Sequence, residues 1–504
     1  MATEYEKTEL SDAEKEFMLR FKSEMSAMQN LRRKHESKWK RLERQFDAKL
    51  ESQKSEIKGK LKDEMSNSTQ AVVKIQIDRN TLEQQLGEEG FNIPYRVVPN
   101  GKNTDSYALD VGKYTLDFFV RREGVVGEII DFRWDRGKYG TGFLDSSIWI
   151  TKCVNNVPKG GDFMSSEFEK VESVDFHIGL RNVNVWDVWL DERATKWKDV
   201  RRAIRRRCMD IEEFRATYGK HPSFRHVNSV MPVTQDSEDM DMQNMESQTA
   251  NGDARNVYLF DYYNEVTGEF VIVANRCWPV YVGYNVYKDS KIPLTACQMY
   301  KDSSSVWGMP IGDKTISFLS YMNSLTEMAL DKVAVSSMPP LVLGNNGEID
   351  GEIYSGAGEL PILNFNGDAS NVRQLQFDSR IDPHLEAISM ARNEVTQNTG
   401  INPLDYNKPL SGINPFVAGL QEQSRKAKMA VSNAMFDVAI SEAFSKMLEN
   451  LIRFGPRLYG KNFEKIIDGE ALQDVEYLSI QVPNRTVVKI SDGKLKFDDS
   501  YGEY

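Results

Sequence analysis

A dense run of arginines is the first feature of the sequence that could do chemistry. It consists of Arg201, Arg202, Arg205, Arg206 and Arg207. We expect the segment from Asp191 to Tyr218 to be helical, so that the arginines share a helix face. Such a face can be solvated and paired with acids such as Glu212 and Glu213, or it can contact an acidic neighbouring subunit or DNA. Of the two contacts we favour the subunit, since Asp and Glu are plentiful in the chain.

Cysteine, histidine and glycine patterns do not form a catalytic or metal site. His221 and His226 are separated by Pro222 and lack a metal-site spacing. The glycine-rich segment 135–143 lacks the G-x-x-x-x-G-K-S/T spacing of a phosphate loop, so we interpret its glycines as turn or packing residues. The cysteines lie far apart with no C-x-x-C pair, which indicates reduced, mostly buried thiols: Cys153, Cys208, Cys277 and Cys297. We therefore predict a protein that is not an enzyme and has no metal or cofactor.

The chain has 504 residues and a net charge of −11 at pH 7. Its length allows a sizeable core and more than one domain. No apolar run reaches the roughly 18 residues of a membrane helix, and the first residues lack a signal-peptide core. We therefore expect a protein of a cytosol, or of an assembly formed there, with no membrane partner. The acidic charge argues against a general nucleic-acid binder, but it does not exclude a protein that handles DNA without binding it tightly, because each phosphate neutralised by Lys or Arg adds affinity.

The second half of the chain predicts three helices. The first ends before Pro339-Pro340, because proline cannot continue a helix, and its apolar stripe is Phe318, Met322, Leu325 and Ala329. The second runs from Asp382, its predicted N-cap, to Asn398. The third runs from Pro415 to the Gly455-Pro456 stop. Between the first two, short apolar runs and glycine-rich turns in residues 341–377 predict a small β-containing unit.

The N-terminal part predicts another long helix. Ser11 and Glu14 fit a capping box, and the following apolar seam comprises Phe21, Met25, Met28, Trp39, Leu42 and Phe46, interrupted by Arg32 and His35. Three interpretations stay open for this helix: docking on the body of the protein, a coiled coil with a partner, and binding to a membrane surface.

Several other segments are predicted as strands. We expect a β-hairpin from residues 257–263 and 268–273, with a third strand at 281–287. Extended structure is also expected at 72–77, 107–120, 125–134 and 185–190, and a terminal hairpin at 477–482 and 486–490. Residues 229–255 are acidic and poor in large apolar side chains, which predicts a flexible surface insertion.

Two sequence blocks and the order of the elements point to one family. The first block contains Ile292-Pro293-Leu294 and Val306-Trp307-Gly308 and continues into the helix before Pro340. The second block begins at Val185-Trp186-Asp187 and continues through a basic segment to the pair Tyr218-Gly219. Over roughly residues 30–455, this order resembles the portal proteins of tailed bacteriophages, especially the podovirus type.

The resemblance implies an α+β portal fold assembled as a ring, with a mixed α/β wing, a two-helix stem, a small β-containing clip and a long C-terminal helix. Its segments are 1–65, an N-terminal helical arm; 66–228, the first part of the wing; 229–255, the flexible acidic insertion; 256–310, the second part of the wing; 311–338, stem helix 1; 339–377, the clip; 378–400, stem helix 2; 401–414, the channel loop; 415–455, the long wing helix; and 456–504, a C-terminal region with a reduced crown.

The resemblance also implies where function lies. Residues expected to face the channel and DNA are Asp382, Glu386, Glu394, Asp405 and Lys408. Clip residues expected to dock a motor or adaptor are Asn345, Asn346, Glu348, Glu352 and Tyr354.

By the same resemblance the protein is a homo-oligomer, a dodecamer, at one vertex of the capsid. It is expected in the virion, and in the host cytoplasm during assembly. Implied partners are double-stranded DNA, which passes through the channel during packaging and ejection, the terminase, the major capsid protein and tail adaptor proteins. Two alternatives remain open from the sequence: a metal-dependent nucleic-acid-processing enzyme, and a coiled-coil structural adaptor centred on residues 11–62.

Overall fold

The computed structural model combines helices and antiparallel sheets, which makes this an α+β protein. The residues that the structure describes are 10–46, 96–99, 106–158, 168–191, 193–219, 221–236, 254–337, 341–343, 348–349, 365–366, 372–374, 381–399, 415–459, 478–481, 488–491 and 494–497. The chain forms two compact units. The first comprises Met1–Glu43, Leu82–Ile311 and Lys426–Tyr504, and the second comprises Arg44–Thr81 and Gly312–Arg425.

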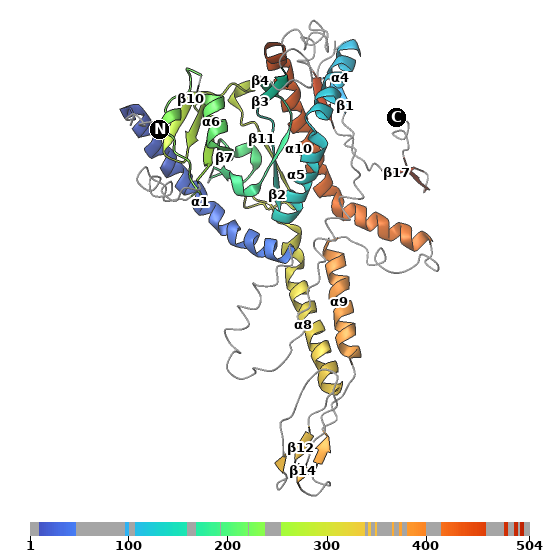
Figure 1. Cartoon of the computed structure of the whole chain (residues 1–504). Helices are drawn as coiled ribbons and strands as arrows, with labels where there is room; N and C mark the ends of the chain where they lie inside the picture. Colours follow the sequence, from blue (N-terminus) through green and yellow to red (C-terminus); the bar gives the residue numbers. More distant parts are fainter. Residues whose placement is uncertain are drawn as a thin grey trace. The chain divides into compact units, whose positions relative to one another are not determined.

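The larger sheet of the first unit is antiparallel, with the strand order β10-β9-β8-β7-β6 (Figure 1). Its strands are β6 (Val188–Leu190), β7 (Arg202–Asp210), β8 (Asn256–Asn264), β9 (Glu269–Ala274) and β10 (Trp278–Tyr284). The predicted hairpin is therefore confirmed as β8 and β9, while the third strand, predicted at 281–287, is β10 and ends at Tyr284. Side chains of this sheet contribute to separate cores, because successive residues of a strand point to opposite faces.

Helix α1 (Asp12–Phe46) packs on this sheet and confirms the docked interpretation of the N-terminal helix. The predicted capping box is present: the Ser11 amide donates to Glu14 Oε2 at 2.9 Å, and the Glu14 amide donates to Ser11 Oγ at 3.4 Å. Phe21, Met25 and Met28 are at most 4% exposed and share a core with β6–β9. The seam residues from Phe21 to Leu42 are thus buried within the same chain, which leaves them unavailable for a coiled coil with another, and the side chain of Phe46 lies outside the description.

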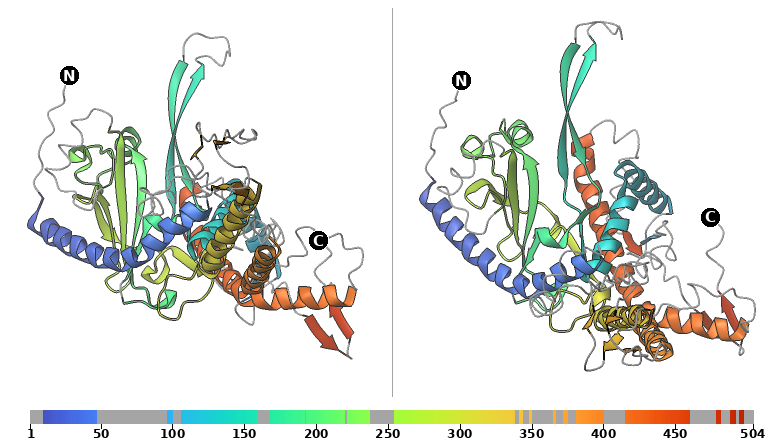
Figure 2. Two further views of the ribbon diagram at one scale, coloured as in Figure 1. Left: turned by 90° about the horizontal axis from the view of Figure 1, so that it is seen from below. Right: turned by 60° about the horizontal axis from the view of Figure 1, so that its bottom comes forward.

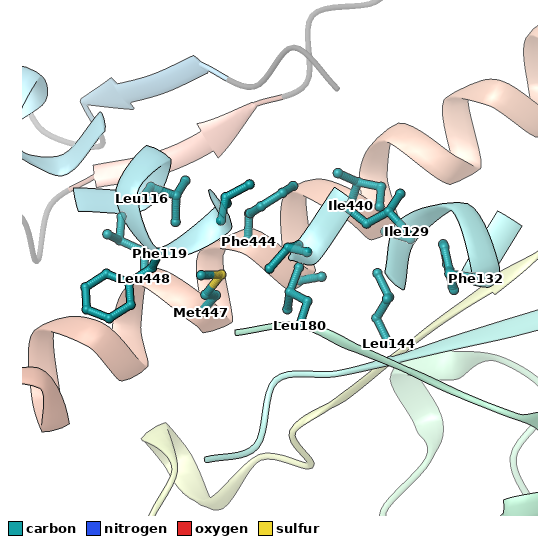
Figure 3. Packing of buried hydrophobic residues seen from close by; sticks show 14 of the residues in the cluster. Leu116, Phe119, Ile129, Phe132, Leu144, Leu180, Ile440, Phe444, Met447 and Leu448 are labelled. Atoms are coloured by element: carbon teal, nitrogen blue, oxygen red, sulfur yellow. The ribbon is translucent and has the colours of Figure 1, made fainter. Parts of the chain in front are cut away.

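A smaller sheet and three helices make the other large core of the first unit. The sheet has the order β11-β2-β5, with β2 (Thr141–Asp145), β5 (Arg181–Val183) and β11 (Leu294–Gln298). The helices are α4 (Ser106–Arg122), α5 (Val125–Tyr139) and α10 (Pro415–Tyr459). Figure 3 shows their side chains packed together, with Phe119 near Phe444 and Leu448 of α10 and Ile129 near Ile440 of the same helix. Each such fully buried side chain stabilises the fold by about 1.5–3 kcal/mol.

A long antiparallel ribbon leaves this unit. Strands β3 (Trp149–Pro158) and β4 (Phe168–His177) pair continuously from Trp149 opposite His177 to Pro158 opposite Phe168. Figure 2 shows the ribbon projecting beyond the sheets of the first unit. At its base the Trp149 and His177 rings stack with centroids 5.5 Å apart, and the Arg181 guanidinium lies 3.7 Å from the Trp149 ring centroid. These contacts fix the point where the ribbon emerges.

Short elements complete the first unit. They are α6 (Ile211–Tyr218), the 3₁₀ helices η3 (Val185–Asp187), η4 (Trp197–Asp199), η5 (Val227–Ser229) and η6 (Lys288–Ser290), and the strands β1 (Arg96–Pro99), β16 (Leu478–Gln481), β17 (Val488–Ser491) and β18 (Lys494–Phe497). The predicted buried segment 185–190 is divided between η3 and β6. The predicted terminal hairpin is wrong, because β16 pairs with β1 and β17 pairs with β18.

Among its described residues, the second unit contains helices α8 and α9, the start of α10 and small paired strands. Helix α8 (Ile311–Ser337) and helix α9 (Asp382–Thr399) run side by side in Figures 1 and 2. Between them in the chain lie β12 (Leu341–Leu343), β13 (Glu348–Ile349), β14 (Phe365–Asn366) and β15 (Val372–Gln374). β12 pairs with β15 and β13 pairs with β14, so the excursion closes on itself. Both helices and the strand at 341–343 were predicted.

Two expectations about helices were wrong. Residues 107–120 and 125–134 were expected to be extended, but they are α4 and α5, joined at Gly124 with φ +63°. Buried Val125, Ile129 and Phe132 are spaced four and three apart, a helical period that aligns them toward α10. The third helix was expected to end at Gly455-Pro456, yet α10 continues to Tyr459 with Pro456 in its last turns.

Gly140 provides a test of how α5 meets β2. It ends α5 with φ +87°, and an added Cβ would lie 2.4 Å from the Gly308 carbonyl oxygen. We expect Gly140→Ala to lower the free energy of unfolding by about 2 kcal/mol or more, since a left-handed backbone and a clash with backbone are combined. Urea titration followed by circular dichroism measures the change.

Gly127→Ala is the matched control. Gly127 lies in the same helix, and its added Cβ would meet nothing within 4 Å. There alanine should raise the stability by about 0.5–1 kcal/mol, because glycine is a poor helix former. Equal effects of the two substitutions would contradict the close approach of Gly140 to Gly308.

Candidate functional site

The arginine run lies on a strand and not on the predicted helix. Residues 202–210 form β7, and only the short helix α6 follows it. A strand turns alternate side chains to opposite faces, so the arginines are not gathered on one surface. Carboxylates of the same chain surround them instead.

Arg205 and Arg207 converge on Asp261 of the neighbouring strand β8. Arg205 Nη2 lies 2.6 Å from Asp261 Oδ2, and Arg207 Nη2 donates to Asp261 Oδ1 at 2.8 Å. Arg205 also pairs with Asp145 at the end of β2. Burial by itself would raise the pKa of Asp261, but the charges of Arg207 and Arg205 outweigh it and lower that pKa. The cluster is a buried ionic centre that connects the two sheets.

Arg206 serves a second cluster on the opposite face of β7. Its Nε donates to Asp187 Oδ1 and its Nη1 to Asp236 Oδ2, both at 2.8 Å. Asp236 also accepts from Arg276 Nε at 2.9 Å.

Asp236 lies within the predicted insertion 229–255, and Val230 and Val233 of the same segment are 0% exposed. The expectation of a flexible surface segment is therefore wrong for residues 229–236, which pack on the sheet, and residues 237–253 lie outside the described residues.

The remaining two arginines of the run lie toward the surface. Arg201 is 3.1 Å from Glu265 with its side chain 58% exposed, and Arg202 is 3.5 Å from Glu24 of α1. The expected contact of the run with a subunit or DNA stays a prediction, and Arg201 is the member most open to it. The expected pairing with Glu212 and Glu213 is replaced by pairing with other acids.

Helix α1 is held to the sheet by polar contacts as well as apolar ones. Arg32 Nη1 donates to the carbonyl oxygens of Trp186 and Val188, each at 3.1 Å. The Arg32 guanidinium also lies 4.1 Å from the centroid of the Trp189 ring. The residue that interrupts the apolar seam in the sequence therefore satisfies carbonyl groups at the start of β6.

Helix α9 exposes the acidic residues expected to face a channel. Asp382, Glu386 and Glu394 are exposed, whereas Ala391 and Val395 of the same helix are 5% and 2% exposed. The predicted N-cap is one residue off: the Ile381 carbonyl accepts from the Leu385 amide, so Asp382 is the first helical residue. An acid at that position interacts favourably with the helix dipole.

Other predicted site residues lie outside the described residues. These are Asn345, Asn346, Glu352 and Tyr354 of the clip, and Asp405 and Lys408 of the channel loop. Glu348 is described in its backbone, where β13 pairs it with Asn366 of β14.

The described part of the chain contains no group of three or more His, Cys, Asp or Glu residues that could hold a metal ion. Cys208, Cys277 and Cys297 are free thiols, the latter two buried. Among the described helices none is long and apolar enough to span a bilayer.

Sequence reasoning missed Asp261 as the partner of the arginines. It lies in the apolar and aromatic strand Val257–Tyr263, where a lone acid that is not paired would be costly. An acid in such a strand, together with a run of arginines, could have indicated a buried ion cluster.

Comparison with models of known protein families and with curated proteins finds no match for this chain.

Asp261→Asn tests the ionic centre. We expect the free energy of unfolding at pH 7 to fall by about 3–5 kcal/mol, because buried Arg205 and Arg207 lose a shared counter-charge. The pKa of Asp261 is lower in the folded protein than its usual value of 3.8, and the stabilisation that results is fully present at pH values above 3.8. That contribution is lost as the pH falls through the folded-state pKa, so the gap between wild type and variant should narrow below about pH 4. Urea titrations from pH 7 to pH 3 measure it.

Asp199→Asn is the control, since Asp199 is exposed on η4 and should change stability by less than about 0.5 kcal/mol. Burial raises the pKa of Asp135 to about 6. This carboxyl titrates in the wild type and in both variants, so its effect cancels when their free energies of unfolding are subtracted. A gap between wild type and Asp261→Asn that widens toward low pH would contradict the assigned direction.

Proposed function

We propose that this protein is a phage portal subunit, which assembles into a ring-shaped conduit for double-stranded DNA at one capsid vertex. The observation that carries the proposal is the second unit together with α10. Helices of 27 and 18 residues flank small paired strands, and a helix of 45 residues follows. This order of elements supports the proposal, because the resemblance implies a stem helix, a clip, a second stem helix and a long helix in the same order.

The exposed charges of α9 fit a conduit. A wall that offered Lys and Arg to DNA would release counterions and bind the passing duplex, which adds friction. Asp382, Glu386 and Glu394 instead offer exposed carboxylates, which repel phosphates and let DNA slide.

The proposal assigns a role to each unit. In the second unit, the strands between α8 and α9 form the clip, on which the terminase docks during packaging and tail adaptors dock later. The first unit forms the wing, whose outer surface meets the major capsid protein. Binding and positioning are sufficient for these roles, and the motor supplies the energy.

Buried seam residues weigh against the coiled-coil adaptor. Trp39 and Leu42 are 2% and 1% exposed within their own subunit, so a partner helix has no apolar stripe of α1 to pack against in that region. Leu19, at 73% exposure, is the large apolar side chain that α1 leaves open among its described residues.

Electron microscopy of the purified full chain, with mass from light scattering on the same sample, tests the proposal. We expect rings with a central hole, as heterologous contacts that close on themselves produce, and a mass of about a dozen times the 57.6 kDa of one chain, the subunit number that the resemblance implies.

Leu19→Glu separates the portal from the adaptor. A portal should keep its rings in this variant, whereas an adaptor that associates through the open face of α1 should dissociate. A protein that stays monomeric or dimeric at high concentration would overturn the portal proposal.

A further inference from the structure

The second half of α1 displays a strongly basic surface. Between Asn30 and Glu43, the exposed charged residues are all cations: Arg33, Lys34, Lys38, Lys40 and Arg41. Asn30 and Ser37 are the other exposed residues of this stretch. We call these seven residues the basic face of α1. The first half differs, since Glu16 is exposed there beside Lys15.

Both acids of this stretch are turned inward. Glu36 lies 2.7 Å from Arg32 Nε, and Glu43 accepts from the Trp186 Nε1 group at 3.1 Å and from the Tyr139 hydroxyl. Outside the helix, Asp302 lies near the basic face. Its pKa is lowered mainly by hydrogen bonds from Ser304, and the charges of His35 and Lys38 lower this pKa further. The basic face therefore keeps a net positive charge in a chain whose total is −11.

The basic face is held rigidly. Trp39 is 2% exposed, and its ring meets those of Trp186 and Trp307 edge-on, with centroids 5.3 and 5.0 Å apart. Figure 2 shows α1 as an outer element of the first unit. A ligand that binds the cations does not have to order the backbone that carries them, which preserves affinity.

We propose that the basic face of α1 binds the phosphate backbone of double-stranded DNA. From Asn30 to Arg41 the helix rises about 16 Å, and over that length one strand of B-DNA carries about five phosphates. The face offers five cations over the same distance. Asn30 and Ser37 add neutral hydrogen-bonding groups of the kinds that commonly contact phosphates. Contacts to phosphates carry no sequence information, so we expect this binding to be independent of sequence.

Composition favours DNA over an acidic protein surface. The core of a protein interface is apolar and depleted of lysine, but the exposed residues from 30 to 43 include three lysines and no apolar side chain. A membrane is also disfavoured, because a surface-bound helix must bury an apolar face in the lipid. In α1 that face, with Trp39 and Leu42, is buried in the protein core.

This inference is independent of the portal proposal. It concerns a surface of α1 in the first unit, whereas the proposed conduit rests on the helices and strands of the second unit. If no rings form and the basic face still binds DNA, the inference stands and the portal proposal fails. If rings form and the face does not bind DNA, the reverse holds.

The test uses the full-length protein and a fluorescently labelled duplex of about 30 base pairs of arbitrary sequence. Fluorescence anisotropy gives the dissociation constant between about 50 and 200 mM salt. The variant Lys34→Gln/Lys38→Gln/Arg41→Gln removes three cations from the basic face. We expect at least a tenfold weaker affinity at about 50 mM salt. The slope of log K against log salt should become shallower by about 2.7, or 0.9 for each lost phosphate contact.

The matched control, Lys113→Gln/Arg121→Gln/Lys291→Gln, removes three exposed cations from other elements. We expect the affinity of this control to stay within about twofold of wild type and its salt slope to stay within about 0.5. If DNA binding depended on net charge alone, the two variants would lose affinity equally. Equal losses would overturn the proposal, as would wild-type protein that fails to bind the duplex. Preferential binding of poly-glutamate, or of vesicles rich in anionic lipid, would do the same. Circular dichroism must first show wild-type helix content and melting temperature in both variants.

Discussion

The burial of Asp261 between Arg205 and Arg207 is the interaction on which the first unit depends. It links β7 and β8 in the centre of the larger sheet, and through Arg205 and Asp145 it reaches the end of β2 in the smaller one. Charges at such depth are stable only when each has a partner. Register is therefore constrained, since a slip of one residue along β7 would turn both arginines to the opposite face.

Helix α10 brings distant parts of the chain into the same core. Lys446 Nζ donates to the Leu294 carbonyl at 2.7 Å, and Asn450 Nδ2 donates to the Ser146 carbonyl at 2.7 Å. Arg136 of α5 donates to the Ser432 carbonyl at 2.7 Å. These contacts join strands and helices separated by more than a hundred residues. The first unit is thus a body whose core is closed by a segment that follows the second unit in sequence.

Charge in this protein is sorted by location. The densest arginine run in the sequence is neutralised internally, mostly by carboxylates of neighbouring strands and loops. The exposed charged residues of α1 between Asn30 and Glu43 are all cations, while α9 exposes Asp382, Glu386 and Glu394. A conduit for DNA needs a channel wall that does not bind the duplex, and a separate surface can bind it without hindering passage. The charge that a surface exposes, and not the density of charged residues in the sequence, decides which partner that surface can bind.

The sequence by itself determined the helices and the hairpin whose patterns are long and regular. The capping box at Ser11 and Glu14, the proline after α8, and the alternation in β8 and β9 are local chemistry, which acts within a few residues. Tertiary structure decided the rest. Strand β7 forms where a helix was expected, because Asp261 and the cross-strand pairs satisfy its arginines, and α4 and α5 are stabilised by packing on α10. Their partners lie far away in the sequence, and contacts of that kind override local preference without leaving a local pattern.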